Sequence, residues 1–399
     1  MSIDIDRVRA AFPALRSGVA FFDGPGGSQT PEPVARAVAD ALTSGIANRG
    51  TITQAERRAD DIVIAARAAI ADLVGGDPRG VVFGRSMTSL TYDLARTLAA
   101  DWSAGDDVVV TRLDHDANIR PWVHAAERAG ASVRWVDFDP ATGELPVEAV
   151  AAELSERTRL VAVTAASNLI GTRPDVAAIA AQAHRVGALV SVDGVHLTPH
   201  AAVDMKALGA DFYACSPYKF FGPHHGALVA DPELLDTLHP AKLLPATDEV
   251  PERFEQGTLP YELLAGTAAA VDFIADLTPA TGTRRQRLLA SMSAVHEYED
   301  QLFARLTTGL EDIAGVTRHA KPSASTPTAL FSVRGCTPHQ VHEHLAARGV
   351  NAPGGSFYAL EASMLLGLGS AGAVRAGLAP YTDETDVDRL LAGVGELAA

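Results

Sequence analysis

Seven short apolar segments, separated by polar turns and alanine-rich stretches, most constrain the fold of this chain. They are GVVFG (80–84), DDVVVTR (106–112), SVRWVDF (132–138), RLVAVTA (159–165), ALVSVDG (188–194), ADFYACS (210–216) and GALVAD (226–231). Amphipathic helical segments lie between them, such as TSLTYDLARTLAA (88–100) and RPDVAAIAAQAHRVG (173–187). Apolar strands that alternate with helices predict an α/β fold, with a mostly parallel sheet covered on both faces. In such a sheet, ligands bind at the carboxyl ends of the strands.

The composition is that of a globular protein with a sizeable core. The 399 residues are 47% hydrophobic and 21% charged, which is enough for two domains. The net charge of -16 argues against nucleic acid or an anionic membrane as a partner. No secretory signal is recognisable at the N-terminus, and no segment reaches the roughly 18 apolar residues of a membrane span. With only Cys215 and Cys336 available, no disulfide framework is expected, so we predict a cytoplasmic protein.

The pattern of strands and helices is interrupted once. A turn-rich segment covers residues 232–262, and a helix near 284–312 then leads to a smaller α+β portion. We therefore predict an N-terminal segment, 1–20, that packs with a small C-terminal domain, 276–399. Residues 21–275 would form the large domain.

Polar turns follow four of the predicted strands and are expected to meet in one crevice: GRSMTS (84–89), LDHDANIRPW (113–122), SNLIGT (167–172) and VDGVH (192–196). The first lies between a strand and a helix. Backbone N–H groups near Ser86 and Met87, with the hydroxyl of Thr88, could therefore hold a phosphate at the helix N-terminus. The alternative is that Ser86 or Thr88 only caps the helix.

Two opposite charges are expected at buried strand ends. Asp193 directly follows one strand, and Lys219 stands in ACSPYKFFGPHHG (214–226) at the end of another. Burial of an unpaired charge is costly, so each needs a partner. A direct ion pair is one alternative, but two buried ions gain little over apolar packing. Pyridoxal 5′-phosphate satisfies both residues better: its aldehyde condenses with a lysine, its ring nitrogen takes a carboxylate, and its phosphate suits a helix N-terminus.

Nine motifs in order along the chain carry a resemblance to a known family: FFDGPGGSQTP, NRGT, VVFGRSMTSL, DHDANIRPW, SNLIGT, VDGVH, SPYKFFGP, RFEQGT and VRAGLAPYTDETDVDRLL. The chain resembles the class V aminotransferases of the fold-type I pyridoxal phosphate enzymes, especially the cysteine desulfurase and selenocysteine lyase branch. The resemblance implies a mostly parallel seven-stranded sheet flanked by helices, with a smaller C-terminal α+β domain.

The resemblance also implies roles for residues around the cofactor ring. Lys219 would be the Schiff-base lysine, Asp193 the partner of the ring nitrogen, and His115 the ring stacked on the cofactor face. Asn168 and His196 would lie near the phenolic oxygen. The desulfurases usually carry glutamine in place of His196, and an imidazole can also donate a hydrogen bond.

Phosphate and substrate contacts follow from the same resemblance. Thr88 and Ser216 would bind the phosphate, with Tyr218 as a further contact where desulfurases usually have histidine. Thr258 would reach the phosphate from a second subunit, which implies a homodimer. Arg375 would pair with the substrate's α-carboxylate, a task that suits the guanidinium fork. Taken alone, Arg375 could instead be a surface residue.

The expected reaction depends on a loop of the small domain. By the resemblance, this loop would carry the thiolate nucleophile of a desulfurase. The corresponding segment, NAPGGSFYALEAS (351–363), has no cysteine, and Ser356 is the nearest counterpart of the expected cysteine. Cys215 and Cys336 are expected to be packing residues. We therefore expect an enzyme that acts on an amino acid through an external aldimine, as a lyase (C–S or other β-elimination) rather than a persulfide-forming desulfurase. The alternative is an aminotransferase or epimerase, and the sequence does not identify the substrate.

Two other readings stay open at this point. Asp193, His196 and His200, or the pair His224 and His225, could belong to a metal-dependent hydrolase. A pseudoenzyme with the same fold is the other, although Lys219 and Asp193 are both present.

Overall fold

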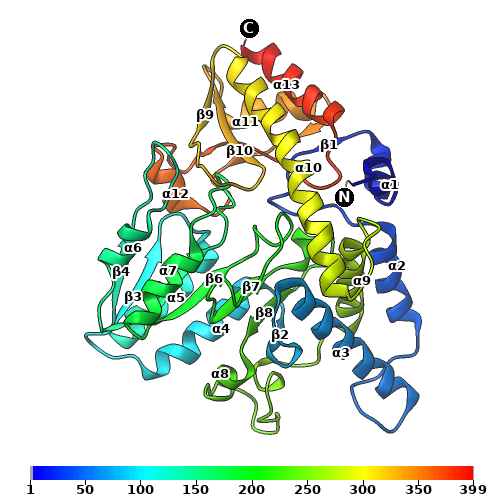
Figure 1. Cartoon of the computed structure of the whole chain (residues 1–399), viewed down its shortest axis with the longest axis vertical. Helices are drawn as coiled ribbons and strands as arrows, with labels where there is room; N and C mark the ends of the chain where they lie inside the picture. Colours follow the sequence, from blue (N-terminus) through cyan, green and yellow to red (C-terminus); the bar gives the residue numbers. More distant parts are fainter. Residues whose placement is uncertain (1–2, 399) are drawn as a thin grey trace.

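The computed structural model describes residues 3–398, so Met1 and Ser2 of the predicted N-terminal segment and Ala399 of the predicted small domain lie outside the described residues. A seven-stranded sheet occupies the lower part of the molecule in Figure 1. Its strands, in spatial order, are β2 (Val81–Gly84), β8 (Gly226–Ala230), β7 (Phe212–Cys215), β6 (Leu189–Asp193), β5 (Thr158–Thr164), β3 (Asp107–Thr111) and β4 (Ser132–Val136).

The sheet is parallel from β4 to β7, and β8 runs antiparallel to both β7 and β2. This confirms the predicted α/β fold with a mostly parallel sheet. The strand β4 departs from the prediction of a strand apolar throughout, because Ser132 and Arg134 are exposed. It lies at the sheet edge, where one side of the strand faces solvent.

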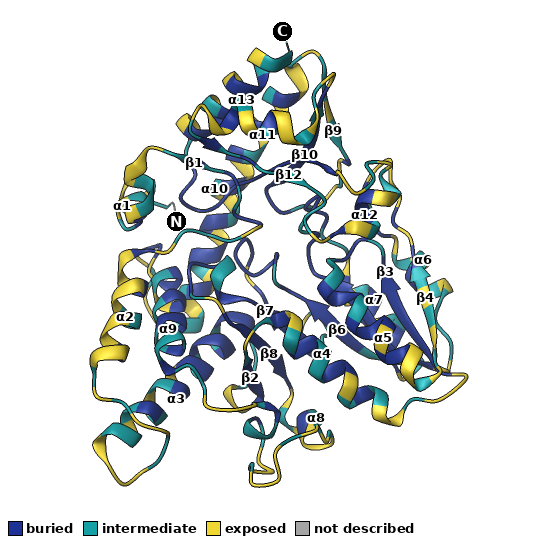
Figure 2. Cartoon of the chain, turned by 180° about the vertical axis from the view of Figure 1, so that it is seen from behind, coloured by how far each residue is buried: buried dark blue, intermediate teal, exposed yellow. Residues whose placement is uncertain are grey.

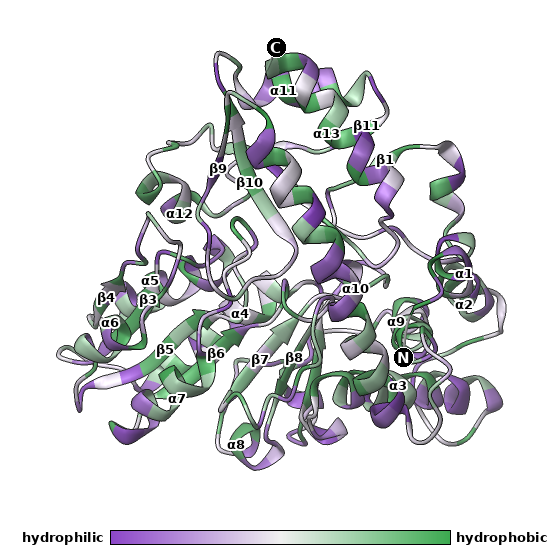
Figure 3. Ribbon diagram, turned by 45° about the horizontal axis from the view of Figure 1, so that its top comes forward, coloured by the Kyte–Doolittle hydropathy of each residue, from purple (hydrophilic) through white to green (hydrophobic). Residues whose placement is uncertain are grey.

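Helices cover both faces of the sheet. Val109 and Val163 belong to a buried cluster with α3 (Gln54–Val74), α7 (Val176–Arg185) and α9 (Tyr261–Ala275). Val108 and Val110 point the other way and pack with α4 (Met87–Leu98) and α5 (Arg120–Ala129). This alternation follows from the pleat of a strand. Figure 2 shows the central strands as buried, and Figure 3 shows them as mostly hydrophobic.

A second, four-stranded antiparallel sheet lies in the upper part of Figure 1, with the order β12 (Gly354–Gly355), β13 (Ala373–Gly377), β10 (Thr328–Val333) and β9 (Val316–His319). The long helix α10 (Arg284–Asp312) packs on α9 below and on α13 (Glu384–Ala398) above. Its range agrees with the helix predicted near 284–312.

The N-terminal residues contact the C-terminal part of the chain. The strand β1 (Ala20–Phe21) pairs in parallel with β11 (Val350–Asn351), and Arg9 forms an ion pair with Asp386 at 2.7 Å. The division of the chain at residues 20 and 275 stays a prediction. The remaining helices are α1 (Ile5–Ala10), α2 (Glu32–Thr43), α6 (Val147–Ala152), α8 (Pro232–Asp236), α11 (Pro338–Ala346) and α12 (Leu360–Leu365). Across residues 3–398, no helix has the length and apolar character needed to cross a membrane.

Candidate active site

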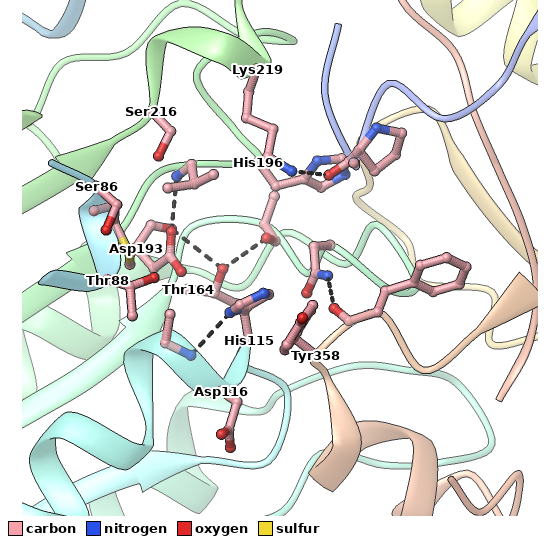
Figure 4. A pocket seen from close by; sticks show the side chains of 18 of the residues that line it. Ser86, Thr88, His115, Asp116, Thr164, Asp193, His196, Ser216, Lys219 and Tyr358 are labelled. Atoms are coloured by element: carbon pink, nitrogen blue, oxygen red, sulfur yellow. Dashed lines mark hydrogen bonds between the residues drawn. The ribbon is translucent and has the colours of Figure 1, made fainter. Parts of the chain in front are cut away.

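A cavity of about 500 Å³ opens at the carboxyl ends of β5, β6 and β7, and Figure 4 shows its interior. Its volume is in the range of small-molecule and cofactor sites. It collects most of the side chains that the sequence singled out: Ser86, Met87, Thr88, His115, Asn168, Asp193, His196, Ser216, Tyr218, Lys219 and Arg375. Residues more than 280 positions apart in the chain thus share one cavity.

Asp193 and Lys219 both line this cavity without pairing with each other. Asp193 is the last residue of β6, and its carboxylate accepts the N–H of Val195 at 2.9 Å. Lys219 follows β7 in a short 3-10 turn, and its Nζ donates to the carbonyl of Pro25. Among the described residues no ion pair joins the two, so the alternative of a direct salt bridge is wrong.

Burial changes the acidity of both groups. It raises the pKa of Asp193 to about 6, against the opposing effects of the Val195 N–H and the Lys219 charge. Burial, with help from the charge of Arg375, lowers the pKa of Lys219 to about 7. A buried amine with this pKa is neutral in a large fraction of molecules at neutral pH, as a nucleophilic lysine requires.

The turn at the start of α4 suits an anion. Ser86 caps the helix: its Oγ accepts the N–H of Ser89 and its own N–H donates to the Oγ of Ser89, both at 3.1 Å. The Ser86 side chain therefore caps the helix, as the alternative to a phosphate contact predicts. Met87 and Thr88 are the first residues of the helix, where N–H groups lack acceptors within the helix. These N–H groups and the exposed Thr88 side chain fit a phosphate better than Ser86 does.

Gly226 of β8 lies directly behind this turn. A Cβ atom at this position would lie 2.2 Å from the backbone nitrogen of Met87 and 2.3 Å from the carbonyl carbon of Ser86. Only glycine allows this close approach of strand and turn. The sequence ACSPYKFFGPHHG therefore supplies both the lysine and the glycine that shape the site.

His115 lies in the cavity as a neutral imidazole. Its Nδ1 accepts the N–H of Ala117 at 3.0 Å. Burial lowers its pKa to about 4, and the charges of Lys219 and Arg375 act in the same direction. Figure 4 shows His115 beside Tyr358, with 5.6 Å between ring centroids and an interplanar angle of 31°.

Nδ1 of His196 and Oδ1 of Asn168 are among the buried polar atoms at the cavity that have no hydrogen-bond partner within residues 3–398. The other end of each side chain is fixed, since Nε2 of His196 lies 2.9 Å from the Thr328 hydroxyl and Nδ2 of Asn168 donates to the carbonyl of Phe357 at 2.9 Å. Buried polar atoms are rarely left unpaired, so these two fit a polar group of a bound cofactor or substrate.

Arg375 comes from β13 and is only 2% exposed, so the alternative of a surface arginine is wrong. Its Nη1 donates to the carbonyl of Asn168 at 2.8 Å, and its guanidinium carbon lies 3.7 Å from the centroid of the Phe357 ring. Burial lowers its pKa to about 9, and Asp23 opposes that effect. A buried guanidinium at a cavity is suited to a carboxylate ligand.

Two predicted site residues lie outside the cavity lining. Thr258 is exposed, in the segment that follows the 3-10 turn Glu252–Phe254, and within one chain it does not reach the site. Ser356 is partly buried but does not line the cavity, whereas the next two residues, Phe357 and Tyr358, do.

The sequence interpretation missed several lining residues. Phe357 and Tyr358 immediately follow Ser356, in the loop where the sequence pattern raises only the question of a nucleophile. Asp116 and Arg120 lie in the quoted motif DHDANIRPW, and they form an ion pair of 2.9 Å. Tyr92, Thr164, Pro25 and Gly26 also line the cavity. Thr164 could have been predicted from the sequence, because it lies at the end of β5 and residues at strand ends often contact ligands in this kind of sheet.

The histidines of the metal-hydrolase alternative point to separate partners. His200 lies 2.9 Å from Glu299, and His196 contacts Thr328. His224 stacks on Tyr218 with ring centroids 4.8 Å apart, while His225 contacts Thr267 at 2.5 Å. In the described part of the chain, no three His, Cys, Asp or Glu side chains are grouped as metal ligands.

Comparison with known proteins decides the family. The family model described as Aminotransferase class-V matches residues 20–390. The chain belongs to this family. Among curated relatives, the uncharacterized protein MT3887 of Mycobacterium tuberculosis is 35% identical over the full length of both chains. A cysteine desulfurase of Klebsiella pneumoniae is 30% identical, covering 99% of this chain and 98% of the relative.

Solved structures agree with this family assignment. The apo structure of the cysteine desulfurase from Thermococcus onnurineus NA1 has a TM-score of 0.90 and 26% identity, covering 100% of this chain and 98% of the other. A mutant C-DES protein shares the fold, with 21% identity and a TM-score of 0.81 over 98% of this chain and 99% of its own, and that structure holds glycine covalently linked to its PLP cofactor.

Pyridoxal 5′-phosphate is the cofactor of this member of the class V aminotransferase family. The cavity fits it: the start of α4 and the close approach of Gly226 form a cradle for the phosphate, and Lys219 and Asp193 offer an amine and a carboxylate. The unpaired Nδ1 of His196 and Oδ1 of Asn168 suit a polar ring substituent.

Proposed function

We propose that this member of the class V aminotransferase family is a lyase that releases a group from the β-carbon of an amino acid, by cleavage of a C–S bond or another β-elimination, and that it does not form a protein persulfide. The observation that carries the proposal is the cavity lining: no cysteine belongs to it, and the loop on which a desulfurase would carry its thiolate contributes Phe357 and Tyr358 instead. Neither aromatic ring can attack sulfur.

The two cysteines are poorly suited to replace the missing thiolate. Cys215 is fully buried at the end of β7, and burial raises its pKa to about 12, so it stays a thiol at neutral pH. Cys336 lies just before α11 and packs against the hydrophobic cluster of the C-terminal part. Neither cysteine lines the cavity.

The cavity residues would divide the work of an elimination. When bound, the cofactor supplies an electron-accepting ring that stabilises negative charge at the substrate's α-carbon. Lys219 would hold the cofactor and, once free, would take the proton from the α-carbon. Asp193 would keep the ring nitrogen protonated, neutral His115 would lie against the ring face, and Arg375 would bind the carboxylate.

Phosphate binding and assembly complete the proposal. Met87, Thr88, Ser216 and Tyr218 would bind the phosphate, with Ser86 shaping the turn. By the family resemblance, Thr258 would reach the phosphate of a second subunit in a homodimer. It is exposed and outside the cavity of its own chain, which is compatible with that role. From its composition and cysteine content, the protein would be cytoplasmic.

The test is to incubate the holoenzyme with cysteine and to identify both the products and the state of the protein. The proposal predicts pyruvate, ammonia and sulfide in equal amounts, with no added sulfur on the protein by mass spectrometry. Alanine together with a persulfide on Cys215 or Cys336 would overturn it. Conversion of amino acids to their keto acids without loss of the β-substituent would instead favour the aminotransferase alternative, which the name "aminotransferase-like protein" of a 32% identical relative from Gibberella zeae makes worth testing.

A further inference from the structure

The loop between β12 and α12 has an unusual backbone. Phe357 and Tyr358 are consecutive residues in the left-handed region, with φ of 53° and 58°. Bulky side chains rarely adopt this conformation, and it persists only where surrounding contacts impose it. We call residues 356–359 the aromatic loop.

Contacts from the other side of the cavity hold the aromatic loop in place. The N–H of Asp116 donates to the carbonyl of Tyr358 at 2.7 Å, and Nδ2 of Asn168 donates to the carbonyl of Phe357 at 2.9 Å. Directly after the loop, Glu361 of α12 forms ion pairs with Arg112 and Arg120. Both carbonyls of the loop are thus bound to the opposite wall, and both side chains line the cavity.

Phe357 and Tyr358 both line the cavity, and we call their two rings the aromatic wall. Phe357 lies on one face of the Arg375 guanidinium, 3.7 Å from its central carbon to the ring centroid. Tyr358 lies next to His115 and is 78% exposed although it lines the cavity, so its ring is available to a ligand (Figure 4). A substrate whose carboxylate pairs with Arg375 would lie beside Phe357, and Tyr358 is the next residue of the same loop.

We infer that the substrate is a cysteine thioether whose sulfur carries an aromatic or other large apolar group, bound against the Phe357 and Tyr358 rings. This inference rests on the proposed lyase function and names its substrate class. A thioether needs no thiolate on the protein: the Cβ–S bond breaks, and the sulfur leaves as a thiol after gaining a proton. Water then converts the three-carbon remainder to pyruvate and ammonium, so that R–S–CH2–CH(NH3+)–COO− and H2O give R–SH, CH3–CO–COO− and NH4+.

Binding can be measured without any reaction. The acids 3-(benzylthio)propanoate and 3-(methylthio)propanoate keep the carboxylate and the sulfur but lack the amine, so they cannot react with the cofactor. Isothermal titration calorimetry of the holoenzyme should show the benzyl acid binding about tenfold or more tighter, as expected for burial of a phenyl ring. Tyr358→Ala should reduce this preference to less than about threefold, whereas Tyr358→Phe, which keeps the ring, should retain it.

Met364→Ala is the matched control, because Met364 is an exposed apolar residue of the adjacent helix α12 that does not line the cavity. Its preference for the benzyl acid should equal that of the wild type. Thermal unfolding of each variant checks that the fold is intact, and the phenylalanine variant keeps the test decisive if the alanine variant is unstable.

Turnover separates this inference from the proposed function. Pyruvate release from S-benzylcysteine should exceed that from S-methylcysteine by about tenfold in kcat/KM. Equal binding of the two acids together with equal pyruvate release would overturn the aromatic wall and leave the lyase function standing. Tight binding of the benzyl acid with no pyruvate from either thioether would support the wall and refute the lyase function.

Discussion

Lys219 illustrates how surroundings set the chemistry of a single side chain. Burial and the charge of Arg375 lower its pKa to about 7, while the carboxylates of Asp193 and Asp23 act in the opposite direction. The larger effects favour the neutral amine. Attachment of the cofactor aldehyde requires this neutral form, because a protonated amine has no free electron pair.

The pH dependence of cofactor attachment follows from this pKa. Attachment of pyridoxal phosphate to the apoprotein should be slow at pH 5, rise through a midpoint near pH 7 and level off above it. An ordinary lysine would give a midpoint near its unperturbed pKa of about 10.4. Stopped-flow absorbance at a series of pH values measures the midpoint. The Arg375→Gln variant lacks the positive charge that helps to lower the pKa of Lys219, so its midpoint should lie at a higher pH. A wild-type midpoint above pH 9 would contradict the account.

At the scale of the residue, the sequence predicts those functional side chains that lie directly after a predicted strand. Asp193 and Lys219 could be placed because each follows an apolar strand, and the structure brings both to one cavity. The side chains of Phe357 and Tyr358 could not be placed, because their direction depends on a left-handed backbone that contacts with Asp116 and Asn168 impose. Such contacts join segments more than 180 residues apart, so no local pattern reveals them.

Among the elements, the segment that leads to Thr258 is fixed by a buried ion pair. Glu255 accepts from Arg67 at 2.8 and 2.9 Å and from the N–H of Phe83 at 2.8 Å. The side chains of Arg67 and Glu255 are 7% and 4% exposed. This pair ties the turn-rich segment to α3 and β2, and so determines where Gln256, Gly257 and Thr258 emerge.

Removal of one partner should therefore be costly. Glu255→Ala leaves Arg67 buried without its main partner and should lower the free energy of unfolding by roughly 3–5 kcal/mol. Glu32→Ala is the control, since Glu32 and Arg36 form an ion pair with 53% and 68% exposed side chains, and its loss should cost less than about 1 kcal/mol. Urea denaturation measures both variants. Equal, small losses would show that the buried pair does not hold the segment.

The elements themselves were predictable to different extents. Each of the seven apolar segments overlaps a strand of the large sheet, and the sequence also predicts the range of α10, because both patterns are local. The order of the strands and the antiparallel direction of β8 were not derivable from residues alone, since they depend on contacts between distant segments. The pairing of β1 with β11 is a contact of the same kind.

At the scale of the whole molecule, the proposed dimer concerns one predicted site residue, Thr258. The cavity takes residues from both sheets, yet Thr258 is exposed and outside the cavity of its own chain. The dimer proposed above would bring it to the neighbouring site. In a symmetric dimer such an exchange occurs twice, so both sites depend on the interface.

Complementation between variants tests the shared site. Lys219→Ala should be inactive, and a subunit in which Thr258 and its neighbours are replaced should bind the cofactor weakly. Co-expression should give hybrid dimers with one intact site, and mixing in equal amounts should restore about a quarter of wild-type activity. Sedimentation should show a dimer throughout. A fully active, cofactor-bound monomer would refute the shared site.

The most direct test of the whole account is to find the residue that carries the cofactor. The holoenzyme is reduced with borohydride, digested and analysed by peptide mass spectrometry. The account predicts a pyridoxyl group on Lys219, within the peptide that contains SPYKFFGP, and none on the Lys219→Ala variant. A label on Lys206, Lys242 or Lys321, or no label on a protein that had bound the cofactor, would contradict it.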